Sequence, residues 1–485
     1  MIVRVAILVL CVAVQGRGSP MATTYDTIIV GLGPAGCTAA STLAQAGKKI
    51  LALEAQNRIG GRVKTVPFGD GVIELGAEWI HGTHPSRVYD LAIKNNVSII
   101  SQNLGFEAYR SNGTKADTAL INELFEYTLE VQEHPPETPQ PLGQFITTKI
   151  KEYLGEKHPD VLKDKDYVDE ILHFLDLLVD NYEASNSWND VTTQTHYVDL
   201  EGDQHMSWHR NGYSTLFDIL LNTYKGGPGY PNLEIQLNKE VVLIEWPTDP
   251  EQLVTVSCKD GTKYTANNVI VTVSLGVLKE RHSALFTPTL PQTKVTAINK
   301  IAMGLIGKAV FHFDVKWWRA DREAFYLFWL KGDGLSKNET DDWTTDIVGY
   351  TVPKGCEKCL TFWMKYDTAM MVEKLPEDVV KSKIMEILRK FLGKHFTIPE
   401  PVAMIRSDWH SNPFTRGSYT YDNVDAPKYP DARIHLGEPL LDSAGKPRVL
   451  FAGEATDPTH FSTVHGATDT GYREAMRLLP ATSKI

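Results

Sequence analysis

The stretch TIIVGLGPAGCTAASTLAQAGKKILALEAQNRIGGR, residues 27–62, decides the fold of the chain. It begins with a β-branched run typical of a buried strand, and a helix expected over 37–46 connects this run to a second apolar strand. The turn before the helix holds Gly31, Gly33, Pro34, Ala35 and Gly36. Its G-x-G-x-x-G spacing lets the backbone turn tightly, approach a pyrophosphate and pack against a helix whose dipole faces the phosphates. The stretch therefore predicts a βαβ unit that binds a dinucleotide.

An acidic residue and an arginine-rich segment extend this pattern. Glu54 ends the second strand about 20 residues after the turn, where a carboxylate can accept hydrogen bonds from an adenosine ribose. This spacing does not separate NAD from FAD. Arg58-Ile59-Gly60-Gly61-Arg62 follows directly, and a guanidinium there can bind pyrophosphate oxygens from the side opposite the helix. This second signal, with Arg62 as the contact, favours FAD.

Length and charge narrow the possible functions. The chain has 485 residues, of which 42% are hydrophobic, enough for two or three domains with cores of their own. Its formal net charge is −11, and such a surface would repel nucleic-acid phosphates, so the balance argues against a nucleic-acid partner. The acidity favours a small cationic ligand if it is concentrated near a cleft, and it also fits plain solubility.

The N-terminus has the pattern of a secretory signal. Residues 1–19 contain an arginine, a short apolar run and then small polar residues, so we expect a cleaved signal peptide and a secreted or lumenal protein. An integral membrane span needs about 20 apolar residues, and we find none in the sequence. Asn96, Asn112 and Asn338 lie in Asn-x-Ser/Thr sequons, which suit a secreted glycoprotein and also arise by chance.

Four cysteines lie beyond the expected signal peptide: Cys37, Cys258, Cys356 and Cys359. The last two form a C-x-x-C pair, which can be a structural disulfide, two free thiols or half of a zinc site. A zinc site would need two further ligands, and no second C-x-x-C is present, so we expect no metal and prefer the disulfide.

The rest of the chain alternates between helix and strand patterns. A proline-rich loop is expected at 133–141, and helical spacing covers 142–181. Short strands at 233–237, 241–246, 253–258 and 262–264 predict a small antiparallel layer. A buried strand at 268–273 is expected to continue into 274–278, and a strand at 448–455 precedes a helix at 466–479.

Strands of the dinucleotide-binding type thus occur near the beginning, middle and end of the chain. We therefore expect an α/β protein with a discontinuous, Rossmann-like FAD-binding domain and an inserted α+β substrate-binding domain. The FAD-binding domain is expected at 22–94, 209–302 and 406–480, and the substrate-binding domain at 95–208 and 303–405.

Several motifs in a fixed order resemble the FAD-dependent amine oxidase family, and within it the animal polyamine oxidases. They are GLGPAG, RIGGR, ELGAEWIHG at 74–82, the segment 271–278, and 451–475 with STVHG at 462–466. The resemblance covers nearly everything after the expected signal peptide. It implies oxidation of amines by hydride transfer to FAD, bound without a covalent link because no cysteine aligns with the flavin-linking position of the monoamine oxidases.

The resemblance also implies further cofactor contacts. Besides the residues of the glycine turn, Glu54 and Arg62, these are Gly76, Ala77, Trp79, Val241, Trp409, Glu454, Thr463 and Val464. Val241 is expected to contact adenine through its backbone, and Trp409 to lie beside the flavin ring. Thr463 stands where monoamine oxidases have a second aromatic residue, which argues against a monoamine oxidase.

Two catalytic residues are carried over from the family. Lys308 is the single charged residue of the apolar segment 301–311, and the resemblance implies that it holds a water against the flavin N5; an exposed lysine on an edge strand is the alternative. His81 follows Trp79 and matches a histidine at the substrate channel, although a histidine beside a tryptophan is also common in protein cores. Glu78 departs from the family, which has a small polar residue there, and its carboxylate could bind an amine or perturb the flavin.

The substrate site is predicted from the same resemblance. Tyr419, Ser462 and Thr463 are expected to line it, because an aromatic face attracts an amine cation and excludes water. Glu183 and Ser185 resemble the substrate-binding pair of spermine oxidase, with solvated loop residues as the alternative.

The sequence therefore predicts an enzyme that oxidises a small cationic amine, spermine, spermidine or an acetylated form, with FAD and dioxygen and releases hydrogen peroxide. A secreted L-amino-acid oxidase is the first alternative, but it requires a cationic group for the substrate carboxylate, and no arginine matches. A flavin-binding protein with little catalytic activity is the second. The oligomeric state is not predicted.

Overall fold

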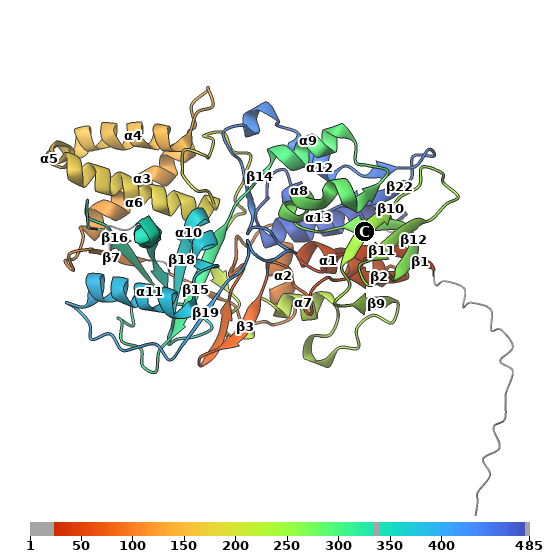
Figure 1. Ribbon diagram of the computed structural model, residues 1–485, viewed down its shortest axis with the longest axis horizontal. Coiled ribbons are helices and arrows are strands. Elements are labelled where there is room, and N and C mark those ends of the chain that lie inside the picture. Colours follow the sequence, from red (N-terminus) through yellow and green to blue (C-terminus); the bar gives the residue numbers. More distant parts are fainter. Residues whose placement is uncertain (1–23, 104, 334–338, 481–485) are drawn as a thin grey trace, which may run out of the picture.

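The computed structural model describes residues 24–103, 105–333 and 339–480. Two large sheets lie side by side along the longest axis of the molecule, each with its own helices (Figure 1). The predicted signal peptide at 1–19 and the sequon at Asn338 lie outside the described residues. None of the helices in the described ranges is long and apolar enough to cross a membrane.

The nine-stranded sheet contains the glycine turn. Its centre is parallel: β1 (Thr24–Val30) pairs with β2 (Ile50–Leu53) on one side and with β12 (Lys263–Val271) on the other. Beyond these, β9 (Leu233–Gln236) pairs with β2 and β22 (Pro447–Phe451) with β12, again in parallel. The apolar side chains of β1 and β2 are almost completely buried, as β-branched and leucine-rich runs require when helices cover both faces of a sheet.

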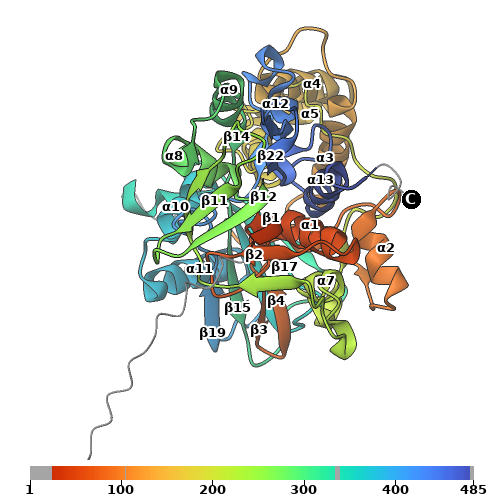
Figure 2. The same ribbon diagram turned by 90° about the vertical axis from the view of Figure 1, so that its right-hand side faces the viewer.

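Helices close this sheet on both faces (Figure 2). On one face, α1 (Pro34–Gln45) packs along α13 (Val464–Arg477), so the first and last helices are neighbours. Gly471 belongs to this contact, because a Cβ atom there would stand 2.1 Å from the carbonyl oxygen of Ala35. Near the other face lie α8 (Leu275–Leu285), α9 (Gln292–Lys300) and α12 (Ala432–Gly437).

The predicted antiparallel layer is confirmed for three of its four strands, and only the strand at 233–237 lies elsewhere. β10 (Val241–Glu245), β11 (Val254–Cys258) and β12 are indeed antiparallel, but they extend the nine-stranded sheet, and β13 (Phe286–Thr287) and β21 (Leu440–Leu441) complete it. β9 pairs with β2, far from β10, because the register of a strand depends on long-range pairing that local pattern does not contain.

Three predicted element boundaries also differ. The helix after the glycine turn begins at Pro34, since proline lacks an N–H that the first turn of a helix would leave unpaired. The segment 274–278 is the start of α8, because the Ser274 hydroxyl accepts a hydrogen bond from Val277 N at 3.2 Å and caps the helix. The last helix begins at Val464, capped in the same way by Thr463.

The second sheet has six strands in the order β19, β15, β18, β17, β16, β7. Their bounds are β7 (Phe106–Arg110), β15 (Ile306–His312), β16 (Ala324–Phe328), β17 (Ile347–Thr351), β18 (Cys359–Lys365) and β19 (Ala403–Arg406). On one face lie α3 (Thr118–Gln132), α4 (Leu142–Lys157), α5 (Pro159–Lys163) and α6 (Lys165–Glu183), and on the other α10 (Tyr366–Val372) and α11 (Glu377–Leu392) (Figure 1). The helical pattern at 142–181 is thus three helices.

Small elements lie between the two sheets and around them. They are β3 (Thr65–Phe68), β4 (Gly71–Glu74), β5 (Trp79–Ile80), β6 (Ile100–Ser101), β8 (Met206–Ser207), β14 (Ala302–Met303), β20 (Thr420–Tyr421), α2 (Arg87–Lys94) and α7 (Thr215–Leu220). The predicted disulfide between Cys356 and Cys359 is present, next to the β3–β4 hairpin, whereas Cys37 and Cys258 are buried thiols. The division into an FAD-binding and a substrate-binding domain remains a prediction.

Candidate active site

The glycine turn is shaped by Glu54. Leu32 N donates to Glu54 Oε2 and Gln56 N donates to Glu54 Oε1, both at 2.8 Å, so this carboxylate ties the turn to the end of β2. Burial raises the pKa of Glu54, while these two backbone donors oppose that shift. Gly31 has a φ of +93°, and a Cβ at Gly36 would lie 2.0 Å from the carbonyl oxygen of Gly31, so both positions require glycine.

The N-terminus of α1 is available to an anion. Gly33 is its N-cap and no side chain caps the helix, so the first N–H groups, those of Ala35 and Gly36, have no side-chain acceptor among the described residues. Together with the helix dipole, these groups make the turn a site for phosphate oxygens. The segment before β10, which leads to Val241, lies against the same corner, because Lys239 N donates to the carbonyl oxygen of Glu54.

Arg62 and Glu454 meet where the dinucleotide is expected to pass. Arg62 Nη1 donates to Glu454 Oε1 and to the carbonyl oxygen of Ser418, both at 2.8 Å, whereas its Nε and Nη2 groups have no partner in the described part of the chain. Glu454 also accepts from Thr420 Oγ1 and Ser462 N. Burial raises the pKa of Glu454, but Arg62, together with Arg433 and Thr420, outweighs this effect, and the pKa lies below its usual value.

A cavity opens beside this ion pair, at the carboxyl ends of β12 and β22. Arg62, Val271, Gly453 and Glu454 are among its lining residues. Gly453 has a φ of +128°, and no atom lies within 4 Å of the place that its Cβ would occupy. Ligands of open α/β sheets bind outside the carboxyl ends of the strands, so the glycine turn, the Nε and Nη2 groups of Arg62 and the N-terminus of α1 fit a dinucleotide.

Lys308 lies on β15 with only 3% of its surface exposed. Its ammonium group donates to the carbonyl oxygens of Glu74 and Gly76, at 3.0 and 2.9 Å, and to Glu78 Oε2 at 2.7 Å. An ammonium has three N–H donors, and all three are engaged. The alternative of an exposed edge-strand lysine is wrong, and this arrangement leaves no donor for the water that the resemblance assigns to Lys308.

Aromatic rings surround this buried cation. The ring of Trp363, opposite Lys308 on β18, lies 4.2 Å from Nζ, and Trp79 stacks on Trp363 with ring centroids 5.5 Å apart. Trp79 Nε1 donates to Gln102 Oε1 at 2.7 Å. His81 lies at 6.4 Å from Trp79, and burial, followed by the neighbouring His205, lowers the pKa of His81 to about 4. His81 is therefore a neutral imidazole at neutral pH.

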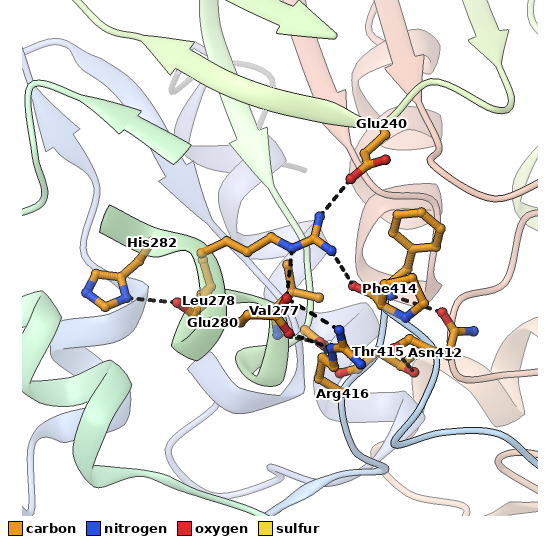
Figure 3. A network of polar contacts seen from close by, with 12 residues as sticks. Glu240, Val277, Leu278, Glu280, His282, Asn412, Phe414, Thr415 and Arg416 are labelled. Carbon is orange, nitrogen blue, oxygen red and sulfur yellow. Dashed lines mark hydrogen bonds and ion pairs between the residues drawn. The ribbon is translucent and has the colours of Figure 1, made fainter. Parts of the chain in front are cut away.

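Trp409 approaches the same segment from the other side. Its indole Nε1 donates to the carbonyl oxygen of Leu75 at 2.9 Å, and a Cβ at Gly76 would stand 3.0 Å from its ring. A polar network anchors the loop that carries Trp409 to α8 and β10 (Figure 3). In it, Ser274 donates to the carbonyl oxygen of Thr415, and Arg416 pairs with Glu280.

This network continues through Arg281, which donates to Glu240 Oε1 at 2.8 Å and to the carbonyl oxygen of Pro413 (Figure 3). The Trp409 loop is thereby tied to α8 and, through Arg281, to the residue before β10. Its position follows from ion pairs as well as from apolar packing.

Glu183 ends α6 and has no hydrogen bond or ion pair within the described ranges. Burial, followed by the nearby carboxylates Asp422 and Asp180, raises its pKa to about 7. Tyr419 lies close to Glu183: burial, and after it the charge of Glu183, raises the pKa of the Tyr419 hydroxyl. This hydroxyl donates to the carbonyl oxygen of Asn181 at 3.0 Å. A partly buried carboxylate next to a tyrosine ring, without a cation of its own, is suited to bind an ammonium group.

The loop after Glu183 is fixed by a buried ion pair. Lys365 Nζ donates to Asp180 Oδ2 and to the carbonyl oxygen of Asn186, both at 3.0 Å. Ser185 is fully buried and donates to Asp180 Oδ1 at 2.7 Å. Ser185 therefore holds the loop, and its hydroxyl is not directed to a substrate in this arrangement.

The STVHG segment uses its hydroxyl groups within the fold. Thr463 Oγ1 accepts from Gly466 N and donates to the carbonyl oxygen of His460, so it caps α13, whose first residue is Val464. Ser462 Oγ donates to the carbonyl oxygen of Thr420. The ligand contacts predicted for Ser462, Thr463 and Val464 remain predictions. The N–H of Ala77 donates to the carbonyl oxygen of Arg62 at 3.2 Å, so Ala77 lies beside the expected dinucleotide path.

Comparison with known proteins places the chain in a family. The model for the flavin containing amine oxidoreductases matches residues 34–479. The chain belongs to this family. This match confirms the family resemblance that the motifs indicated. The family is defined by a flavin cofactor.

Curated relatives cover almost the whole chain. The protein is 31% identical to the human peroxisomal N(1)-acetyl-spermine/spermidine oxidase and 30% identical to the bovine one, in both cases over 93% of this chain and 94% of the relative. It is 27% identical to the probable polyamine oxidase 5 of Arabidopsis thaliana, over 95% of this chain and 99% of that protein. This flavin amine oxidoreductase is thus similar to polyamine oxidases from animals and plants.

Sequence reasoning missed several residues of the site. Trp363 stacks on Trp79, Gln102 accepts a hydrogen bond from Trp79, and Asp180 accepts one from Ser185. Lys365 pairs with Asp180. A lysine at each of two positions in otherwise apolar strands was the available signal, because a buried ammonium requires acceptors. Their partners lie far away in the sequence and could not be assigned from spacing.

Proposed function

We propose that the protein binds FAD without a covalent link and oxidises polyamines, with hydrogen peroxide as a product. The observation that carries the polyamine assignment is the unpaired carboxylate of Glu183 beside Tyr419. A polyamine has several cationic nitrogens, so one can bind a carboxylate while another is oxidised. A monoamine has no second cation for Glu183 to bind.

The dinucleotide would be held by groups already described. The turn at Gly33, the N-terminus of α1 and the free N–H groups of Arg62 would bind the phosphates, and Trp409 would lie against the ring end. When bound, FAD accepts a hydride from the carbon beside the amine nitrogen and later passes the electrons to dioxygen.

The side chains of the chain itself position and protect the substrate. Glu183, in its ionised form, attracts a distal ammonium group, and the rings of Tyr419 and Trp409 exclude water from the reacting end. His81 is neutral, so it can exchange hydrogen bonds with an amine without repelling a cation. Hydride leaves readily only from a carbon beside a neutral nitrogen, so the reacting amine must lose its proton before the chemical step.

A screen for peroxide release tests this function. Purified holoprotein is incubated with spermine, spermidine, their acetylated forms, simple monoamines and L-amino acids. We expect peroxide with at least one polyamine at a kcat/KM well above that of any monoamine. Release with L-amino acids alone would support the first alternative, and a yellow protein that releases peroxide with none of them would support the second.

The L-amino-acid oxidase alternative lacks a group in the described site. A substrate carboxylate requires a free cation, but Arg433 is paired with Asp422, Arg62 with Glu454 and Lys365 with Asp180. The unpaired charge of the site is negative, at Glu183. This charge balance favours a cationic substrate.

We also propose that the protein passes through the secretory pathway. The support is the signal-like sequence at 1–19 together with two sequons whose asparagines, Asn96 and Asn112, are exposed. Expression in cultured animal cells followed by glycosidase treatment tests this: a drop in apparent mass in the medium fraction is expected, and unglycosylated protein confined to the cells would contradict it.

A further inference from the structure

Glu78 forms a buried ion pair whose role the amine chemistry above does not explain. Its side chain is 4% exposed, and that of Lys308 is 3% exposed, with 2.7 Å between Oε2 and Nζ. Glu78 Oε1 has no hydrogen-bond partner in the part of the chain that the structure describes. The pair is therefore poorly exposed and close, and most of its hydrogen bonds are made by Lys308.

The neighbouring titratable groups Glu74 and His205 add no charge to the pair at neutral pH. Glu74 accepts from Thr65 and from Tyr213 N, and burial raises its pKa to about 8, so it is largely protonated at neutral pH. Burial likewise lowers the pKa of His205, which stays neutral. Lys308 and Glu78 thus cancel, and this part of the site carries no net charge.

The pair lies beside the segment 75–78, where the ring end of a bound dinucleotide is expected. Lys308 donates to the carbonyl oxygen of Gly76, Trp409 donates to that of Leu75, and Ala77 N donates to that of Arg62. The segment 75–78 is therefore in contact with Arg62, which lies by the phosphates, and with residues on the six-stranded sheet. A dinucleotide whose phosphates were held by the glycine turn and Arg62 would have its ring end near this segment.

We propose that Glu78 neutralises Lys308 beside the flavin ring and thereby limits how readily the ring takes up negative charge. An uncompensated ammonium group in a dry site strongly stabilises a nearby negative charge, whereas a neutral pair does so far less. Glu78 acts through Lys308, so it is a positioning residue. The inference rests on the proposed function only in requiring a bound flavin.

Sulfite binding measures this property without turnover. Sulfite adds to the oxidised ring to give an adduct with negative charge on the ring, and the flavin absorbance is lost. Holoprotein is titrated with sulfite, and the dissociation constant is read from the bleaching. Glu78→Gln leaves Lys308 uncompensated and is expected to tighten sulfite binding by about tenfold or more.

The pattern across a mutant cycle separates this effect from simple damage. Lys308→Met is expected to weaken sulfite binding, and the double variant Glu78→Gln with Lys308→Met is expected to return it to within about threefold of the unsubstituted protein. Asp442→Asn is the matched control, because it also removes a buried carboxylate next to a cation, Arg448, but at the far end of β22. It is expected to leave sulfite binding unchanged.

Each outcome decides the proposal. Unchanged or weaker sulfite binding in Glu78→Gln would overturn it, as would a double variant that stays at the value of either single variant. If Glu78→Gln does not fold, Glu78→Thr removes the same charge in a smaller side chain and is judged by the same criterion. A colourless unsubstituted protein would contradict the proposed function instead, since no flavin would be present to titrate.

Discussion

Glu454 and Glu183 are two poorly exposed carboxylates of the candidate site, and their environments shift their pKa values in opposite directions. Glu454 accepts three hydrogen bonds, one of them from Arg62, and its pKa lies below the usual value. Glu183 has no partner in the described structure, and its pKa is raised to about 7. The difference shows that Glu454 is already balanced by Arg62, whereas Glu183 at the end of α6 lacks a cation. A cationic ligand would supply it.

The largest effect is expected for Arg62, the ion-pair partner of Glu454. Arg62→Ala leaves Glu454 buried without its main cation, which costs about 3 kcal/mol of stability, and it removes donors from the dinucleotide path. We expect the purified variant to be largely colourless, as measured by the ratio of flavin to protein absorbance, and to unfold at lower denaturant. Arg319→Ala, which breaks an exposed ion pair, is the control. Full flavin content in Arg62→Ala would show that the two carboxylates do not differ as described.

Glu183→Gln removes the carboxylate that has no ion-pair partner and is proposed to bind an ammonium group. A hydrogen bond to a charged group contributes about 1.5 to 3 kcal/mol, so we expect the KM for a polyamine to rise roughly 10-fold to 100-fold. The KM for a simple monoamine should change little, and FAD content should not change. Glu156→Gln, on the exposed face of α4, is the charge-matched control. Equal losses for polyamine and monoamine would contradict the anchoring role.

The pH dependence sharpens the same comparison. Because the pKa of Glu183 is about 7, its carboxylate is protonated below that pH and cannot anchor an ammonium group. Together with the need for a neutral reacting amine, this predicts that kcat/KM for a polyamine rises by about tenfold or more between pH 6 and pH 9. His81 does not account for the rise, since its pKa is about 4. The rise should be shallower in Glu183→Gln, and identical profiles would exclude Glu183 as a titrating group.

The smallest effect is on stability. The folded-state pKa of Glu183 lies above the unfolded value, so the folded protein binds this proton more tightly. The resulting stability is present at pH 4.5 and below, and it is lost as the pH rises through about 7. Glu183→Gln should therefore raise the Tm by about 1 to 2 °C at pH 8.5 relative to its effect at pH 5. Calorimetry of ligand-free protein checks this, and a lower Tm at pH 8.5 would mean that Glu183 has a stabilising partner.

The sequence was most informative where structure depends on neighbours in the chain. The glycine turn, Glu54 and the strand-helix-strand order follow from spacing alone, because each glycine is required by contacts within a few residues or with one packed helix. The disulfide between Cys356 and Cys359 is equally local.

The sequence pattern decided neither the type of every short apolar segment nor which polar side chains meet. The segment 274–278 is apolar enough to read as a strand, but the Ser274 cap makes it a helix. Glu78 and Lys308 are 230 residues apart. Neither their ion pair nor the use of all three N–H donors of Lys308 could therefore be deduced from either motif. Ser185 has the residue type of a substrate contact, and only the structure shows that its hydroxyl is bound to Asp180.

The order of strands in the nine-stranded sheet has a consequence for how the protein folds. β1 pairs with β12, more than 200 residues later, and β12 pairs in turn with β22 near the C-terminus. Such distant parallel pairings close slowly, and during synthesis the edge of β12 stays unpaired until almost the whole chain has emerged. Glu454 and α13 follow β22 in the chain, so they are synthesised last and take their places beside the glycine turn after the other elements. Binding of the cofactor is thus expected only after β22 has paired with β12.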